Sequence, residues 1–270
     1  MINAITKNLN FPEGPAVDSK GNIWLVELHG GNLVRLDADG ALKRFPVSGG
    51  NPNGIAVDAS DNIWFCDAGN DCVSIFNPRT NKIEVFCDSV DGLPLNHPND
   101  LAFDCAGNLL FTCPGDSRQK PTGYVCAAAN NGLVKKVIED KFFPNGLAFS
   151  PDGSALVLAE TYKKRLWKGK WNAKTLAWES AKPWVDVGGE IGPDGMAFGD
   201  DGNLYVAVFG GRAVKTISPD GRVIGEIALE GNNPSNCAFG GGGRLLVTET
   251  EHGELLSIDI GVNGAKLFKR

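Results

Sequence analysis

Six short segments of the sequence place an oxygen-bearing side chain directly after a proline. Their central residues are Glu13, Asn53, Asn99, Asn145, Asp194 and Ser235. Two are carboxylic acids, three are amides, and none is apolar or cationic. Carboxylate and amide oxygens are the ligands that hard divalent cations such as Ca²⁺ and Mg²⁺ prefer. If the fold brings these positions together, the sequence predicts a site for one divalent metal ion.

The same residue types also have an ordinary structural explanation. Asn, Asp and Gly are common in tight turns, so a single Pro-Asn-Gly segment says little about function. Glu13 is not a typical turn residue, and the regular recurrence of the position favours a metal site over a set of unrelated turns.

These six segments open six repeats that are spaced roughly 40 to 50 residues apart, the length of a four-stranded propeller blade. Three residues after each central position comes an alanine: Ala16, Ala56, Ala102, Ala148, Ala197 and Ala238. Five residues further on comes a turn position: Gly21, Asp61, Gly107, Gly153, Gly202 and Gly243. We therefore predict an all-β fold, a six-bladed β-propeller of four-stranded blades, that forms one domain over residues 1–270.

The elements that must position the oxygens follow from this fold. Equivalent residues of a closed propeller lie at one height around one axis, so the central side chains are expected to converge on the mouth of the channel. The alanine is expected near the axis, where inner strands crowd together. The Val or Phe after it is expected to point between blades, because side chains alternate along a strand.

Composition and charge exclude some classes of partner and indicate a cellular compartment. The chain has a net charge of −6 and a pI of about 5.2, unlike the basic surface typical of nucleic-acid binding. No apolar run approaches the length of a membrane span, so neither a nucleic acid nor a membrane is expected as a partner. We expect no signal peptide, and the seven cysteines form no CxxC pair. Reduced thiols in a cytoplasmic protein are the simplest interpretation.

Other residues are candidates for contact with a substrate. His97 lies two residues before Asn99 and is interpreted as a substrate-binding residue or as a solvated loop residue. Asp116 and Arg118 lie in a polar loop after the second strand of the third repeat and could lean over the mouth. No GxSxG motif occurs, so a serine hydrolase elbow is not predicted.

Four motifs resemble those of the gluconolactonase–regucalcin (senescence marker protein) family of sugar lactonases, and the resemblance extends over nearly the whole chain. They are Glu13-Gly14-Pro15, Pro98-Asn99-Asp100, Pro144-Asn145-Gly146 and Pro193-Asp194-Gly195. The resemblance implies that Glu13, Asn145 and Asp194 bind a catalytic divalent metal. It also implies that Asn99 binds this metal or the substrate. Ca²⁺ is the first choice, and Mg²⁺, Mn²⁺, Zn²⁺ or Fe²⁺ are alternatives.

The activity implied is hydrolysis of a small-molecule sugar lactone, with Asp194, expected opposite Glu13 across the ring, as the general base. The family often carries an arginine where this chain has His97. We therefore expect a neutral lactone without phosphate, unless Arg118 supplies the missing charge. Two alternatives stay open: a phosphotriesterase-like or other esterase propeller with the same metal site, and a non-catalytic NHL-type binding propeller. The oligomeric state is not indicated.

Overall fold

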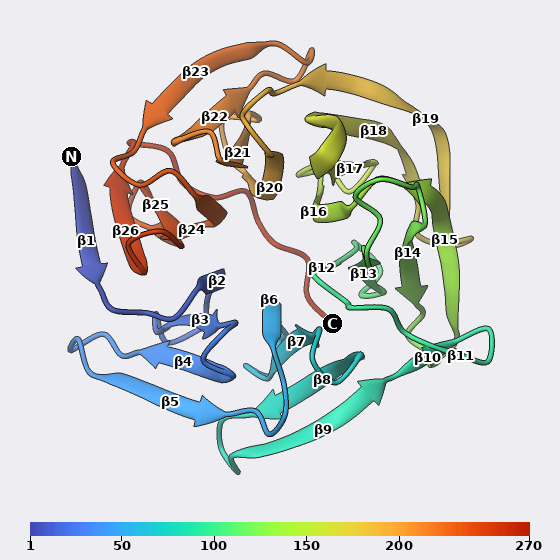
Figure 1. The fold of residues 1–270 in the computed structure, drawn as a ribbon, viewed down its shortest axis with the longest axis horizontal. Helices are drawn as coiled ribbons and strands as arrows, with labels where there is room; N and C mark the ends of the chain where they lie inside the picture. Colours follow the sequence, from blue (N-terminus) through green and yellow to red (C-terminus); the bar gives the residue numbers. More distant parts are fainter.

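The computed structural model describes residues 1–270 and consists almost entirely of β-strands. Six four-stranded sheets stand around a central channel like the blades of a propeller (Figure 1). The predicted fold is confirmed. The one helical element is a short 3-10 turn, η1 (Thr161–Lys163). The structure contains no candidate for a membrane-spanning helix.

Five of the blades follow the predicted order, in which consecutive strands run from the axis outward. Blade 1 contains β2 (Pro12–Val17), β3 (Ile23–Glu27), β4 (Asn32–Leu36) and β5 (Leu42–Pro46). Blade 2 contains β6 (Pro52–Val57), β7 (Ile63–Asp67), β8 (Cys72–Asn77) and β9 (Lys82–Cys87). Blade 4 contains β16 (Pro144–Phe149), β17 (Ala155–Glu160), β18 (Arg165–Asn172) and β19 (Ala177–Asp186). Blade 5 contains β20 (Gly192–Phe198), β21 (Leu204–Phe209), β22 (Ala213–Ile217) and β23 (Val223–Ala228).

Blade 3 has the same order but a shorter inner strand. It contains β12 (Leu101–Phe103), β13 (Leu109–Cys113), β14 (Gly123–Ala128) and β15 (Val134–Lys141). Its opening Pro98-Asn99-Asp100 precedes the inner strand, whereas the other openings are part of theirs. A small hairpin of β10 (Ser89–Val90) and β11 (Leu93–Pro94) leads into this blade.

Blade 6 departs from the sequential pattern that the repeats predicted. It contains β24 (Pro234–Gly241), β25 (Arg244–Glu249) and β26 (Glu254–Asp259), and its outermost strand is β1 (Ile2–Thr6) from the start of the chain. The antiparallel pairing aligns Ile2 with Ile258 and Ala4 with Leu256. The two ends of the chain thus meet in one sheet and close the ring, as Figure 1 shows for β1 beside β26.

The turns between the first two strands of each blade form as predicted, since all six turn positions have positive φ, from 61° at Asp61 to 81° at Gly21. In the first blade the Asp18 carboxylate accepts hydrogen bonds from the Asn22 backbone and side chain at 2.9 and 2.8 Å, and from the Trp24 indole at 3.0 Å. Asp58, Asn62 and Trp64 repeat this arrangement in the second blade. The aspartate therefore ties each turn to the strand that follows it.

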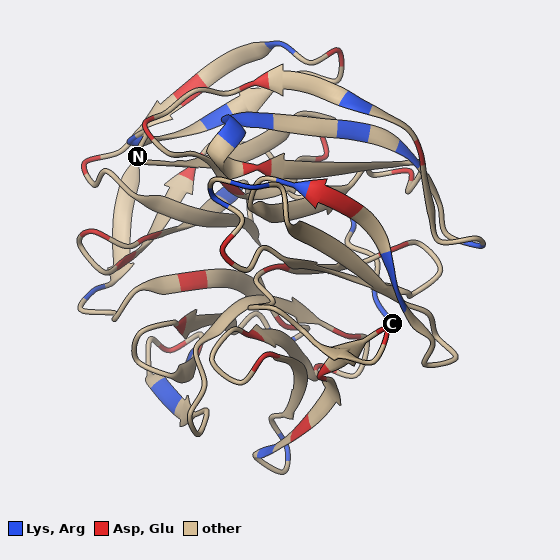
Figure 2. Cartoon of the chain, turned by 45° about the vertical axis from the view of Figure 1, so that its right-hand side comes forward, with Lys and Arg blue, Asp and Glu red and all other residues tan.

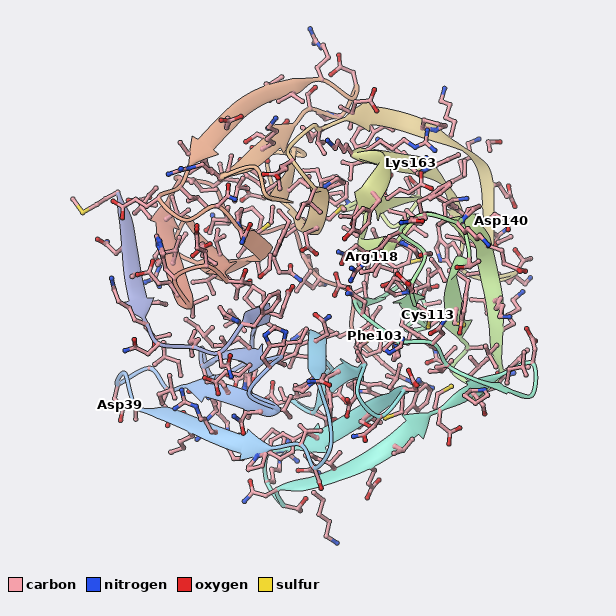
Figure 3. The ribbon with its side chains drawn as sticks, viewed as in Figure 1. Asp39, Phe103, Cys113, Arg118, Asp140 and Lys163 are labelled. Carbon is pink, nitrogen blue, oxygen red and sulfur yellow. The ribbon has the colours of Figure 1, made fainter.

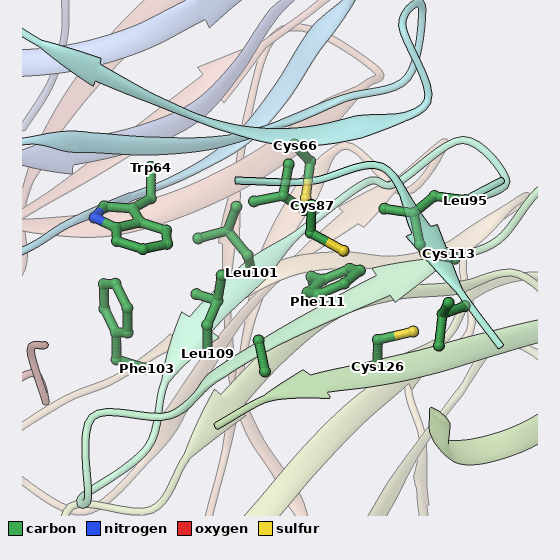
Figure 4. Close-up of a cluster of buried hydrophobic side chains, with 13 residues drawn as sticks. Trp64, Cys66, Cys87, Leu95, Leu101, Phe103, Leu109, Phe111, Cys113 and Cys126 are labelled. Carbon is green, nitrogen blue, oxygen red and sulfur yellow. The ribbon is translucent and has the colours of Figure 1, made fainter. Parts of the chain in front are cut away.

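The hydrophobic core consists of separate clusters between neighbouring blades. The largest joins blades 2 and 3 and packs Trp64, Leu109 and Phe111 with the thiols of Cys66 and Cys113 (Figure 4). No cysteine forms a disulfide, and all but Cys105 are buried. Burial raises the pKa of the Cys66 thiol, so these cysteines act as small apolar side chains.

The channel has a cavity at each end, which we call lower and upper. The lower cavity is apolar, has a volume of about 580 Å³, and is lined by all six repeat alanines and by the residue after each of them. Phe103 does pack between blades, as predicted, but it also faces this cavity. The final segment, residues 263–269, crosses the opening, and the backbone nitrogen of Ala265 donates to Phe198 O at 2.9 Å. Basic and acidic segments are interspersed over the ribbon (Figure 2).

Candidate functional site

The opposite end of the channel is a cavity of about 570 Å³ whose lining includes Glu13, Asn53, Asn99, Asn145 and Asp194. Five of the six oxygen-bearing positions therefore meet in one place. The sixth, Ser235, does not line the cavity. It is fully buried, and its hydroxyl donates to Pro12 O at 2.9 Å and lies 2.9 Å from Thr248 Oγ1.

Acidic residues at the ends of the second strands hold the segments that lead into these ring positions. Glu27 accepts a hydrogen bond from the Asn10 backbone, and Glu160 accepts one from Phe142 at 2.9 Å. Asp67 and Glu249 do the same for the second and sixth blades. These carboxylates fix the entry of each inner strand and hence the height of its ring residue.

The glycines that follow several ring positions are required by close packing. A Cβ on Gly54 would clash with the side chain of Asp100 from the neighbouring blade, and one on Gly195 would clash with Asn236. Asp100 and Asn236 thus fill the space directly below the ring, where they border the lower cavity.

Three buried carboxyl groups gather at this level of the channel. Burial raises the pKa of Glu13, and the nearby Asp100 raises it further. The pKa of Asp194 is raised well above its usual range by burial and then by Glu13 and Asp100, while burial raises that of Asp100 to about 7. No Lys, Arg or His side chain forms an ion pair with any of the three.

The arrangement of the blades corrects one expectation about this ring. β24 of blade 6 contacts both β2 and β20, so Asp194 lies two blades from Glu13 and not opposite to it. The position opposite Glu13 belongs to Asn145 of blade 4. The closeness of the two acids explains why the Glu13 carboxyl raises the pKa of Asp194.

The donor set fits a hard divalent cation. No group of three or more His, Cys, Asp or Glu side chains is arranged to hold a metal, so a metal in this cavity would need amide oxygens beside the two carboxylates. The cavity offers the carboxylates of Glu13 and Asp194 with the amides of Asn99 and Asn145. Buried carboxylates without a cationic partner are unfavourable, and a divalent ion would neutralise two of them.

His97, Asp116 and Arg118 also line the mouth, on the side of the third blade. The exposed His97 ring has Nδ1 3.0 Å from Asn96 Oδ1, and its backbone nitrogen donates to Asp71 at 2.7 Å. Arg118 Nε lies 3.8 Å from Asp116 Oδ1, and Figure 3 places Arg118 close to the channel. Both the histidine and the arginine are therefore positioned to meet a bound molecule.

The wall of the cavity contains residues that the sequence analysis missed. Six large apolar side chains face the mouth from blades 1, 4 and 5: Phe11, Leu28, Phe143, Tyr162, Ile191 and Phe209. One signal was available, because Phe11, His97 and Phe143 all directly precede the opening proline of their repeats. The mouth is thus polar at its floor and along blades 2 and 3, and apolar along the other side.

Comparison with known proteins matches residues 70–251 to the model of the SMP-30/Gluconolactonase/LRE-like region. The chain is 28% identical to a gluconolactonase of Zymomonas mobilis, over 93% of this chain and 79% of the relative. It is also 28% identical to the diisopropyl-fluorophosphatase of Loligo vulgaris, over 99% of this chain and 95% of the relative. A solved structure of a calcium-binding regucalcin from Agrobacterium tumefaciens superimposes with a TM-score of 0.85 at 24% identity, covering 98% and 96% of the two chains. This last likeness concerns the fold.

Proposed function

Because the chain belongs to the SMP-30/gluconolactonase/LRE-like family, we propose that it hydrolyses a lactone in a reaction that depends on a divalent metal ion. The relative named gluconolactonase supports a lactone as the substrate, and its name points to a sugar lactone as the substrate class. The observation that supports metal dependence is the pair of buried carboxylates, Glu13 and Asp194. They lie beside amide oxygens in the upper cavity and have no cationic partner.

In this proposal Glu13, Asn145 and Asp194 hold the metal, and Asn99 binds it directly or through one water. The bound ion would supply Lewis-acid polarisation of the lactone carbonyl and charge stabilisation during hydrolysis. The chain's own residues orient the lactone in the mouth and move the proton. The Asp194 carboxylate takes the proton of the attacking water, because it is the acid at the cavity floor that accepts a hydrogen bond from Asn145 and lies near Glu13.

The test is a pH-stat assay of lactone opening in the metal-loaded protein and after treatment with a chelator. The assay would compare glucono-δ-lactone with δ-valerolactone, each corrected for spontaneous hydrolysis. We expect activity that is lost on chelation and restored by Ca²⁺ or another divalent ion. Activity that persists at a measured metal content of zero would contradict the metal dependence, and no activity on any lactone would contradict the reaction.

A phosphotriesterase activity is the second candidate, because the Loligo vulgaris relative matches over nearly the full length of both chains. A divalent ion held by the same ring would bind a phosphoryl oxygen in place of a carbonyl oxygen. Assay of diisopropyl fluorophosphate under the same conditions separates the two, since we expect a higher kcat/KM for a lactone.

A further inference from the structure

The apolar wall of the mouth is not part of the hydrophobic core. None of its six members belongs to a buried cluster between blades or packs against one. All remain partly or largely exposed to the cavity. Apolar side chains that stay accessible around a polar floor are typical of a ligand site, in which a few polar groups orient the molecule and apolar walls bury the rest.

Two aromatic pairs give this wall its shape. Phe11 and Phe209 stack with ring centres 6.3 Å apart, and Phe143 meets Tyr162 edge-on at 5.4 Å. The Arg118 guanidinium lies 5.9 Å from the ring centre of Phe143 and 5.8 Å from that of Tyr162, so it covers the second pair. No cation covers the Phe11–Phe209 pair, although the His29 ring lies 4.5 Å from Phe11.

Two of the wall residues, Phe11 and Phe143, have a strained backbone conformation. Phe11 has φ of 60° and Phe143 has φ of 56°, a left-handed conformation that is uncommon for bulky residues. Both precede a proline, which restricts their backbone further. The conformation is held by hydrogen bonds, from Leu28 N to Phe11 O at 3.0 Å and from Phe143 N to Ser117 Oγ at 2.8 Å. Glycine would fit this backbone with less strain, so the local conformation does not itself require a phenylalanine at either position.

We propose that Phe11, Phe209, Phe143 and Tyr162 form a specificity wall that selects lactones carrying an apolar alkyl or aromatic substituent over polyhydroxylated lactones. This inference rests on the proposed lactone hydrolysis and concerns the same cavity. It replaces the sugar lactone suggested by the name of the relative with a lactone that carries a less polar substituent. The lactone ring lies on the polar floor near Asn99 and Asp194, and its substituent lies against the Phe11–Phe209 pair. A hydroxylated substituent would bring its hydroxyl groups against carbon and lose hydrogen bonds to water.

The test compares three lactones with the same six-membered ring: δ-decalactone, δ-valerolactone and glucono-δ-lactone. We expect kcat/KM to be highest for δ-decalactone in the wild-type protein. Phe11→Gly is expected to lower that value about tenfold or more, the effect of losing contact between one ring and the substituent. The value for δ-valerolactone, which has no substituent, should fall by a smaller factor. The Tm of this variant is expected to equal or exceed that of the wild type, because glycine relieves the left-handed backbone.

Matched variants separate the effect of losing a ring of the wall from the effect of relieving a strained backbone. Ser180→Gly changes another residue with positive φ, 53°, on the exposed outer strand β19, and should alter no kinetic constant. Phe11→Tyr keeps the ring and should retain the preference. Phe209→Ala removes the other ring of the pair at an ordinary backbone position and should repeat the loss, which keeps the test decisive if Phe11→Gly folds poorly.

The outcomes separate this inference from the proposed function. A wild-type preference for glucono-δ-lactone, or an equal loss for all three lactones in Phe11→Gly, would overturn the specificity wall and leave lactone hydrolysis standing. Failure of the metal-loaded wild type to open any of the three would overturn both.

Discussion

At the scale of single residues, the properties of the site follow from its buried carboxyl groups. Glu13 and Asp194 are 5% and 7% exposed, and Asp100 lies beneath them. A carboxylate in such a place favours its protonated form, because its charge is poorly solvated and faces other negative charges. A divalent ion would reverse this preference and let the acids act as ligands and as a base at neutral pH. The chemistry of the site therefore depends on the charge balance at the cavity floor.

Asp194→Asn tests the role of this acid as the base. The amide keeps an oxygen that can bind a metal but loses the negative charge and the ability to take a proton. We expect an intact fold and a loss of roughly 10²-fold or more in kcat for the best lactone, the contribution of a general base. Asp200→Asn, at an exposed acid of the same blade, is the control. Wild-type activity in Asp194→Asn at unchanged metal content would place the base elsewhere.

The raised pKa values also predict how metal-free stability varies with pH. The folded state of the apoprotein binds protons at Glu13, Asp100 and Asp194 that the unfolded chain has already released above about pH 4 to 5. Stability is therefore expected to fall as pH rises from that range through about 7, where Asp100 titrates, and beyond.

Thermal unfolding of the chelated protein from pH 5 to pH 8 measures this effect, with Tm expected to decrease. Added Ca²⁺ should raise Tm more at pH 8 than at pH 5, because protons and the metal compete for the same carboxylates. A Tm that is independent of pH in the chelated protein would show that water or another group stabilises the charged form of these acids, so that folding does not raise their pKa values.

At the scale of elements, an acid at the end of the second strand holds the start of the inner strand in four of the blades. Glu160 ends β17 and is 1% exposed. It accepts hydrogen bonds from Arg165 Nε at 2.8 Å, the Trp167 indole at 2.7 Å and the Phe142 backbone at 2.9 Å. One carboxylate thus joins β18 to the loop that carries Phe143 and leads to Asn145.

Glu160→Gln is expected to destabilise the fold by about 2 kcal/mol, since hydrogen bonds to a charged acceptor are replaced and the Gln amide group must face a donor. Urea denaturation measures the free energy of unfolding. Glu179→Gln, at an exposed acid on the outer strand β19 of the same blade, should change it by less than about 0.5 kcal/mol. Equal stability of the two variants would mean that Glu160 does not brace the loop.

At the scale of the whole molecule, the propeller is held closed by a strand from the opposite end of the chain. β1 covers the edge of β26, which would otherwise expose unpaired backbone groups. The side chains of β1 are mostly exposed, so its contribution comes chiefly from backbone pairing and from Ala4, which packs against the last cluster of the core. The closing strand lies at the rim of the propeller, away from the site.

Deletion of residues 1–6 is expected to lower the free energy of unfolding by on the order of 3 kcal/mol, because several backbone hydrogen bonds are lost. The uncovered edge should also promote self-association, visible by size-exclusion chromatography. Activity at low temperature should survive, since the ring residues lie on the inner strands or directly before them. Ile2→Thr, which alters an exposed side chain of β1 and keeps the pairing, should have little effect. Unchanged urea denaturation of the deletion variant would show that closure by β1 adds nothing.

The repeat spacing by itself determined that this chain is a six-bladed propeller and which side chains approach its axis. Each blade is a local unit whose inner strand, turn and second strand lie close in sequence. The recurring Ala and turn positions therefore report its geometry directly. The same registration predicted that Glu13, Asn99, Asn145 and Asp194 would face one cavity, because symmetry places equivalent residues at equal height.

Contacts between distant segments were decided only by the tertiary structure. The pairing of β1 with β26, the burial of Ser235 and the two-blade separation of Glu13 and Asp194 all depend on how the ring closes. The specificity wall also depends on ring closure, because Phe11 and Phe209 come from blades 1 and 5, which are not neighbours, and their ring centres lie 6.3 Å apart. Local patterns report the period of a blade, whereas the character of a cavity depends on side chains that only the closed ring brings together.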